Sequence, residues 1–161
     1  MAVAGLDGTK KLSVECMSDL SHCASALVAV PADAAFAFLM DGEALGTWAL
    51  GSFATKTVAP GVVRGVSLFD DQACCVKPVG DAAAGRIEYY VGATPEKLQP
   101  RILAQVVPGP VLGHAEGVCQ VNLIAWRQQG MSDERWLRLV RCHEVEILLI
   151  QARLERPEQG L

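Results

Sequence analysis

The stretch that decides the fold covers residues 26–51 and reads ALVAVPADAAFAFLMDGEALGTWALG. It begins inside an uncharged segment, residues 22–30, whose small and β-branched side chains predict a strand that ends before Pro31. Pro31 suits the first turn of a helix, where its missing N–H is not needed, and residues 32–40 are rich in helix formers. After a glycine, residues 43–50 predict a second short helix. The domain therefore opens with a strand and two short helices.

Residues 52–127 alternate short apolar runs with turn residues such as Pro-Gly and Asp-Asp pairs. Runs that recur about every 8–14 residues predict an antiparallel meander. The runs are SFATKTVA, VVRGVSLF, QACCVKPV, RIEYYVG, RILAQVV and GVCQVNLIAWR. The last run alternates apolar and polar residues, which predicts a sheet with one covered and one wet face. Its apolar face holds Gly117, Cys119, Val121, Leu123 and Ala125.

A long amphipathic helix is predicted from Ser132, an N-cap candidate, to Glu155. Asp133 and Glu134 in its first turn favour the positive end of the helix dipole. At helical spacing, one apolar stripe contains Trp136, Leu139, Val140, His143, Ile147, Ile150 and Leu154. A helix of this kind needs an apolar surface to cover.

This order of elements predicts an α+β fold. We expect a curved seven-stranded antiparallel sheet, two short helices after the first strand, and the long C-terminal helix across the concave face. We expect a single domain over residues 21–156, with a lead-in at residues 1–20 and a tail at residues 157–161. Because many residues of the concave face are small, the space between sheet and helix is expected to exceed what side chains fill.

Two motifs accompany this pattern of elements. The first is VPA-x-x-x-F followed by a tryptophan in the second helix, formed by Val30, Pro31, Ala32, Phe36 and Trp48. The second is GVSLFD at residues 65–70.

These motifs, with WLRLVRCHEVEILLIQARLE at residues 136–155, resemble the SRPBCC superfamily, the helix-grip fold of START lipid-transfer domains and polyketide cyclases. The resemblance covers residues 22–155. Many relatives have a glycine where this chain has Asp71, so the turn there departs from the pattern. The resemblance implies a deep cavity for an apolar small molecule and does not imply one chemistry.

The composition excludes several classes of function. Hydrophobic residues make up 51% of the 161 residues and charged residues 20%, which is typical of a globular protein. The formal net charge of −4 argues against a nucleic-acid partner. No apolar run is long enough for a transmembrane helix, and Glu15 and Asp19 interrupt the segment where a signal peptide would be apolar. We therefore expect a cytoplasmic protein without integral membrane association.

The six cysteines, at positions 16, 23, 74, 75, 119 and 142, do not have metal-ligand spacing. They form no C-x-x-C pair, and His22 and His114 lie at element boundaries, where we expect them to be exposed. We therefore expect small buried thiols, and no metal or other cofactor. Motifs of serine hydrolases, kinases and zinc peptidases are not found in the sequence.

His143 is the main catalytic candidate, because it is the one ionisable residue near the centre of the apolar stripe. Facing a cavity, it would act as a general acid or base; otherwise it is a core histidine that bonds to the backbone. Tyr89 is the second candidate, because Ile87, Tyr89 and Val91 form the more apolar register of their strand and would face inward. In the reverse register, Glu88 would face inward and pair with His143.

Further candidates come from the same elements. Trp48 and Phe53 would form the walls of a cavity mouth or pack the short helices on the sheet, and Trp136 would anchor the long helix or contact a ligand. Arg101 would bind a carboxylate or carbonyl if it faced inward, but the placement we expect is the solvated convex face. The expected ligand-binding set is Trp48, Phe53, Tyr89, Val121, Leu123, Trp136, Val140, His143 and Ile147.

Three functions fit these expectations. The preferred one is binding or transfer of a small hydrophobic molecule, lipid-like or polyketide-like, between the sheet and the C-terminal helix. The alternative is a polyketide cyclase- or dehydratase-like enzyme without metal, in which His143 acts as acid or base beside Tyr89. The third is an interaction module that uses the sheet or the cavity mouth as a protein surface. A homodimer is compatible with each of them.

Overall fold

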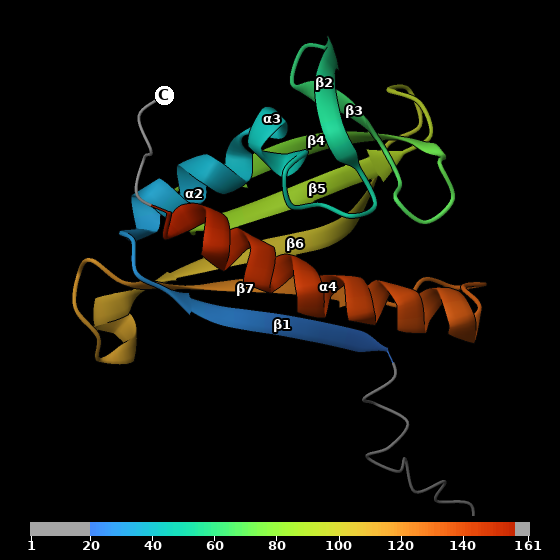
Figure 1. Ribbon diagram of the computed structural model, residues 1–161. Helices are drawn as coiled ribbons and strands as arrows, with labels where there is room; N and C mark the ends of the chain where they lie inside the picture. Colours follow the sequence, from blue (N-terminus) through green and yellow to red (C-terminus); the bar gives the residue numbers. More distant parts are fainter. Residues whose placement is uncertain (1–19, 157–161) are drawn as a thin grey trace, which may run out of the picture.

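Seven strands form one sheet, and a long helix crosses its inner face (Figure 1). This computed structural model describes residues 20–156, so the expected tail and all but one residue of the expected lead-in lie outside the described part. The elements follow in the order β1 (Ser21–Val28), α2 (Ala32–Met40), α3 (Gly42–Leu45), β2 (Phe53–Ala59), β3 (Val62–Val66), β4 (Ala73–Asp81), β5 (Arg86–Gly92), β6 (Gln99–Pro108), the 3-10 helix η1 (Gly109–Leu112), β7 (Cys119–Trp126) and α4 (Asp133–Leu154).

The sheet joins the two ends of the domain. Its strand order is β1-β7-β6-β5-β4-β3-β2, so the first strand pairs with the last, from Ser21 opposite Trp126 to Val28 opposite Cys119. Every neighbouring pair of strands is antiparallel. The expected α+β architecture is confirmed: a seven-stranded antiparallel sheet, short helices after the first strand, and a C-terminal helix.

One face of the sheet is buried beneath the helices, as the alternation in the last apolar run predicts. The β7 side chains on this face are nearly inaccessible to water and belong to Cys119, Val121, Leu123 and Ala125. On the opposite face, Ser25 of β1 donates a hydrogen bond to the Asn122 side chain of β7 at 2.8 Å. The two faces therefore differ in chemistry as an open antiparallel sheet requires.

The second short helix is shorter than the sequence predicts, because α3 ends at Leu45 rather than at residue 50. The Asp41 side chain caps α3 by accepting hydrogen bonds from two backbone N–H groups of its first turn. Beyond Leu45 the chain continues in hydrogen-bonded turns, because the N–H groups of Thr47 and Trp48 bond to carbonyls three residues back. The chain also passes so close to β2 that a Cβ added to Gly46 would overlap the Thr55 side chain.

The C-terminal helix α4 lies along β1 and β7, at one edge of the sheet (Figure 1). Ser132 caps its first turn by accepting a backbone hydrogen bond, as the sequence predicts. At the other end, the Gln151 side chain donates to the carbonyl of Leu27 at 2.9 Å. The Glu155 side chain accepts from the N–H of Ala29, also at 2.9 Å. These bonds attach the last turn of α4 to the end of β1.

Two isoleucines supply the apolar contact between α4 and the core. Ile147 is 4% exposed and Ile150 is 0% exposed, and both pack in the cluster that contains Val28 and Val121. Leu148, on the outer side of the same turn, is 59% exposed. The helix is therefore held by one side only.

We predict that Ile150→Ala lowers the free energy of unfolding by about 2–5 kcal/mol, because the truncation leaves a hole in a packed core. The matched change on the exposed side, Leu148→Ala, should alter it by less than about 0.5 kcal/mol. Urea unfolding followed by circular dichroism measures both values. Equal effects of the two substitutions would contradict the packing of this face on the sheet.

Candidate functional site

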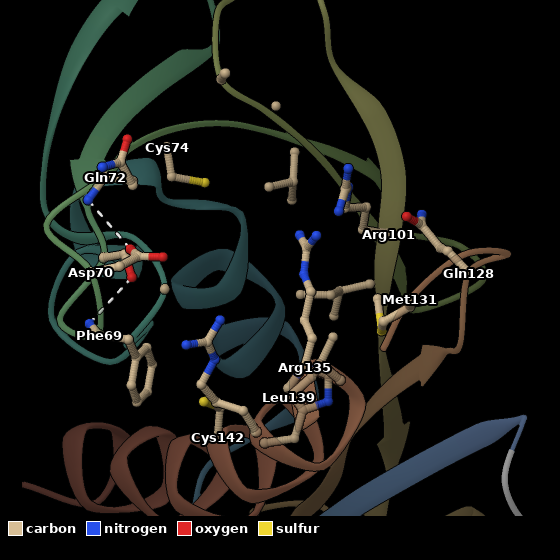
Figure 2. Close-up of a pocket in the computed structure, with 18 of the residues that line it drawn as sticks. Phe69, Asp70, Gln72, Cys74, Arg101, Gln128, Met131, Arg135, Leu139 and Cys142 are labelled. Atoms are coloured by element: carbon tan, nitrogen blue, oxygen red, sulfur yellow. Dashed lines mark hydrogen bonds between the residues drawn. The ribbon is translucent and has the colours of Figure 1, made fainter. Parts of the chain in front are cut away.

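A cavity of about 430 Å³ lies between the first turns of α4 and the sheet (Figure 2). Its walls come from α4, from the loop between β3 and β4, and from the adjoining ends of β4, β5, β6 and β7. Side chains that reach it include those of Phe69, Asp70, Cys74, Arg101, Arg135, Leu139 and Cys142. Small-molecule sites typically measure roughly 300–1,000 Å³, so this volume suits a small ligand.

A second cavity, of about 100 Å³, adjoins the first. The lining residues that both share are Gly51, Cys74, Val91, Ile102, His143 and Glu146. The remaining wall of the smaller cavity is mostly apolar and is formed by Leu45, Trp48, Ser52, Val76, Tyr89 and Leu123. The larger cavity is called the outer chamber below, and the smaller one the inner chamber.

His143 lines both chambers and is 2% exposed. Burial, and to a smaller extent the nearby His22, lowers the pKa of His143 to about 4, so its ring is neutral near pH 7. Its Nδ1 is buried, and no described residue forms a hydrogen bond with it. The His22 ring lies 6.2 Å from the His143 ring, centre to centre. His22 is half-buried rather than exposed as expected, because it shares the inward face of β1 with Ala24 and Val28.

Glu146, one turn beyond His143, also lines both chambers and is 6% exposed. Its side chain accepts a hydrogen bond from the N–H of Leu50 at 2.8 Å, which attaches the segment after α3 to α4. Burial raises the pKa of Glu146 to about 7, and hydrogen bonds from the backbone of Leu50 and Gly51 partly oppose this rise. The sequence prediction missed Glu146, which lies at the edge of the apolar stripe. Its spacing from Leu139 and His143, seven and three residues, was the available signal.

Tyr89 faces inward, in the register that the sequence favours, and is 2% exposed. Its hydroxyl donates to the carbonyl of Leu39 at 2.8 Å, and burial raises the pKa of Tyr89. The reverse register does not occur, since Ile87 and Tyr89 are the buried side chains of β5 and Glu88 lines neither chamber. Trp48 packs edge-on against Tyr89, with 6.0 Å between ring centres. The Nε1 of Trp48 is buried in the wall of the inner chamber and has no hydrogen-bond partner among the described residues.

Arg101 reaches the outer chamber because β6 contains a bulge. Tyr89 pairs with Ile102 and Tyr90 pairs with Pro100, which leaves Arg101 without an opposite residue on β5. The extra residue turns Arg101 to the same side as Ile102, and both line the outer chamber. The expected placement of Arg101 on the convex face was therefore wrong. Its Nε is buried and has no hydrogen-bond partner in the described part of the chain.

Two further arginines, Arg135 and Arg138, line the outer chamber from the first turns of α4. Figure 2 shows Arg101 and Arg135 extending into this chamber from different walls, one on the sheet and one on the helix. The guanidinium of Arg138 lies 5.5 Å from the centre of the Phe69 ring. Asp70 belongs to the same loop as Phe69. Hydrogen bonds within this loop, followed by the charges of both helix arginines, lower the pKa of Asp70.

The structure brings part of the expected ligand-binding set together. The members that line the chambers are Trp48, Tyr89, Leu123 and His143. The members that lie outside the walls of these two chambers are Phe53, Val121, Trp136, Val140 and Ile147. The division follows from the position of α4 over β1 and β7, because the centre of its apolar stripe faces those strands and one edge faces the chambers.

Two features are missing from the described part of the chain. Within residues 20–156, no three His, Cys, Asp or Glu side chains are grouped closely enough to hold a metal ion. In the same range, no helix is long and apolar enough to cross a membrane.

Neither a protein-family model nor a curated protein sequence matches the chain. Solved structures do. The ZhuI aromatase/cyclase from a Streptomyces species aligns with a TM-score of 0.62 and 15% identity, over 88% of this chain and 98% of that one. The di-domain aromatase/cyclase BexL aligns with a TM-score of 0.61 and 16% identity, over 84% of this chain and 46% of that one. An uncharacterized protein from Bacillus thuringiensis aligns with a TM-score of 0.63 and 14% identity, over 84% of this chain and 99% of that one.

At these identities the similarity concerns the fold, and it extends over most of the described residues. The helix-grip fold that the sequence resemblance implied is thus confirmed, and the chain shares its fold with these aromatase/cyclases.

Proposed function

We propose that this protein binds a small, largely apolar molecule in its two adjoining chambers. The observation that carries the proposal concerns the buried polar atoms without hydrogen-bond partners among the described residues. Nδ1 of His143, Nε1 of Trp48 and Nε of Arg101 belong to residues that line the chambers, and the fourth such atom, Nε2 of His22, lies outside them. Leaving such an atom unsatisfied costs about 1–3 kcal/mol, so these atoms are rare in folded proteins unless a function uses them. Three of them, from three different elements, meet around one hollow.

The inner end of the site suits the apolar part of such a ligand, because it carries little charge. His143 is neutral above about pH 4, and Glu146 is protonated below about pH 7. The other walls of the inner chamber are mostly aliphatic and aromatic, and burying apolar surface there contributes about 25 cal/mol per Å². The N–H of Trp48 adds a donor for a carbonyl or hydroxyl oxygen of the ligand.

A polyketide cyclase- or dehydratase-like reaction is the alternative function. It is supported by the fold shared with aromatase/cyclases and by the neutral imidazole of His143 beside both chambers. Tyr89 does not complete a proton-transfer pair with His143, because its hydroxyl donates to the carbonyl of Leu39. Binding requires no such pair and is therefore the function that we propose. Turnover of a poly-carbonyl substrate that is lost in His143→Gln would favour the enzyme instead.

Binding can be measured with N-phenyl-1-naphthylamine, an uncharged dye whose fluorescence rises in apolar surroundings. We predict saturable binding at one site. Leu139→Trp adds bulk to the wall of the outer chamber and should weaken binding about tenfold, because the dye and the larger side chain compete for the same space.

The matched control is Leu137→Trp, the same substitution on the outer side of α4, where Leu137 is 57% exposed. It should leave the dissociation constant of the dye unchanged. Thermal melts of both variants show whether the fold is retained. Equal affinity in the two variants, or no saturable binding by the wild type, would rule out the chambers as a binding site.

The buried pair of His143 and Glu146 makes a prediction for stability. Because the folded pKa of His143 is lowered from 6.5, its contribution is present above pH 6.5 and is lost as the pH falls toward 4. Because the folded pKa of Glu146 is raised from 4.5, its contribution is present below pH 4.5 and is lost as the pH rises through 7. Between pH 4.5 and 6.5, the His143 contribution to the free energy of unfolding increases with pH, whereas the Glu146 contribution decreases.

Single substitutions should therefore separate the pH dependence that His143 gives to the free energy of unfolding from the one that Glu146 gives. Relative to the wild type, the unfolding free energy of His143→Gln should fall as the pH is raised from 4.5 to 6.5, because the variant lacks the His143 contribution that the wild type gains. That of Glu146→Gln should rise between pH 4.5 and 7, because the variant lacks the Glu146 contribution that the wild type loses. Urea titrations at several pH values measure both profiles. Parallel profiles for the two variants would contradict the pKa shifts.

A further inference from the structure

The outer chamber is basic although the protein as a whole is acidic. The chain has a formal net charge of −4. Three arginines nevertheless line this chamber, Arg101, Arg135 and Arg138, and Asp70 is the one carboxylate of its lining besides the buried Glu146. A local excess of positive charge in a concave site attracts anions.

Arg101 has no carboxylate partner in the described part of the chain. The ion pairs found among residues 20–156 involve Arg86, Arg127 and Arg141, and none of them involves Arg101 or Arg135. The buried Nε of Arg101 also has no hydrogen-bond partner there. A cationic group that is partly removed from water without an anion is destabilising. The bulge in β6 thus turns the guanidinium of Arg101 toward the chamber, and no carboxylate of the described residues neutralises its charge.

Arg135 extends toward the same space from α4 (Figure 2). Both side chains carry a positive charge, so an anion placed between them would interact favourably with each. A guanidinium offers two parallel N–H donors, which match the two oxygens of a carboxylate. Arg138 is less available, since its guanidinium lies over the ring of Phe69.

We propose that the ligand is an amphipathic organic acid whose apolar body fills the inner chamber and whose single acidic group lies between Arg101 and Arg135. This inference rests on the proposed binding function and narrows it to a ligand class. Polarity along the site sets the orientation: the arginines occur in the outer chamber alone, and Trp48, Tyr89 and Leu123 in the inner one. A single charge is preferred to a double one, because Asp70 in the lining of the same chamber repels a second negative charge.

A pair of dyes tests the proposal directly. N-phenyl-1-naphthylamine and 1-anilinonaphthalene-8-sulfonate have the same arylamine body, and the second carries one added sulfonate. At pH 7 and low salt, the wild type should bind the anionic dye about tenfold more tightly than the neutral one, as expected for charge-assisted hydrogen bonds. This ratio of affinities should fall as salt is added, because the outer chamber is open to solvent.

Substitutions of single arginines show which side chains cause the preference for the anionic dye. Arg101→Met and Arg135→Met should each reduce the ratio of affinities by about fivefold to tenfold. Arg153→Met removes the same charge from an exposed position in the last turn of α4, away from both chambers, and should leave the ratio unchanged. Arg101→Lys should give an intermediate ratio, because it keeps the charge and loses the forked geometry. Near-ultraviolet circular dichroism confirms that each variant is folded.

The outcomes separate this inference from the proposed function. Saturable binding of the neutral dye with no preference for the anionic one would overturn the inference and leave the binding function intact. A preference that survives in Arg101→Met and Arg135→Met, or that Arg153→Met reduces equally, would also overturn it. Failure of both dyes to bind would overturn the binding function itself.

Discussion

The attachment of α4 to β1 and β7 is the constraint on which the rest of the structure depends. Ile147 and Ile150 pack on the core. The Gln151 side chain bonds to the backbone in the last part of β1, and the Glu155 side chain bonds to the backbone just after β1. The helix is thereby held at one edge of a sheet that continues through β6, β5 and β4 (Figure 1). A single helix cannot pack directly on all of these strands, and both chambers lie between one side of α4 and the strands that it does not contact closely.

This placement gives the two sides of α4 different chemistry. Most of its apolar stripe is buried on the sheet, whereas His143 of the stripe lines the chambers together with Arg135 and Glu146, which lie beside the stripe. Burial favours the uncharged forms of His143 and Glu146, so the inner end of the site is apolar and holds hydrogen-bonding groups without full charges. The arginines near the start of the helix remain charged. A gradient from charged to apolar along one hollow is what an amphipathic molecule requires.

Much of the fold could be predicted from the sequence, because the decisive signals are local: the proline that precedes α2, the alternation in β7 and the N-cap Ser132 of α4. The inward register of Tyr89 followed from the apolar neighbours on its face. The site was harder to predict, since its walls depend on where the axis of α4 lies over the strands. Glu146 lies at the edge of the stripe, and Arg101 faces inward through a one-residue bulge that alternation cannot reveal.

The central claim is that α4 encloses a ligand-sized hollow against β4, β5 and β6 instead of filling it. The most direct measurement is an isotope-filtered nuclear Overhauser experiment on the methyl-labelled protein with bound N-phenyl-1-naphthylamine. We expect contacts from the dye to the methyl groups of Val91, Ile102 and Leu123, which line the chambers. Contacts confined to the exposed methyl groups of Leu137 and Leu148 on the outer side of α4 would contradict it.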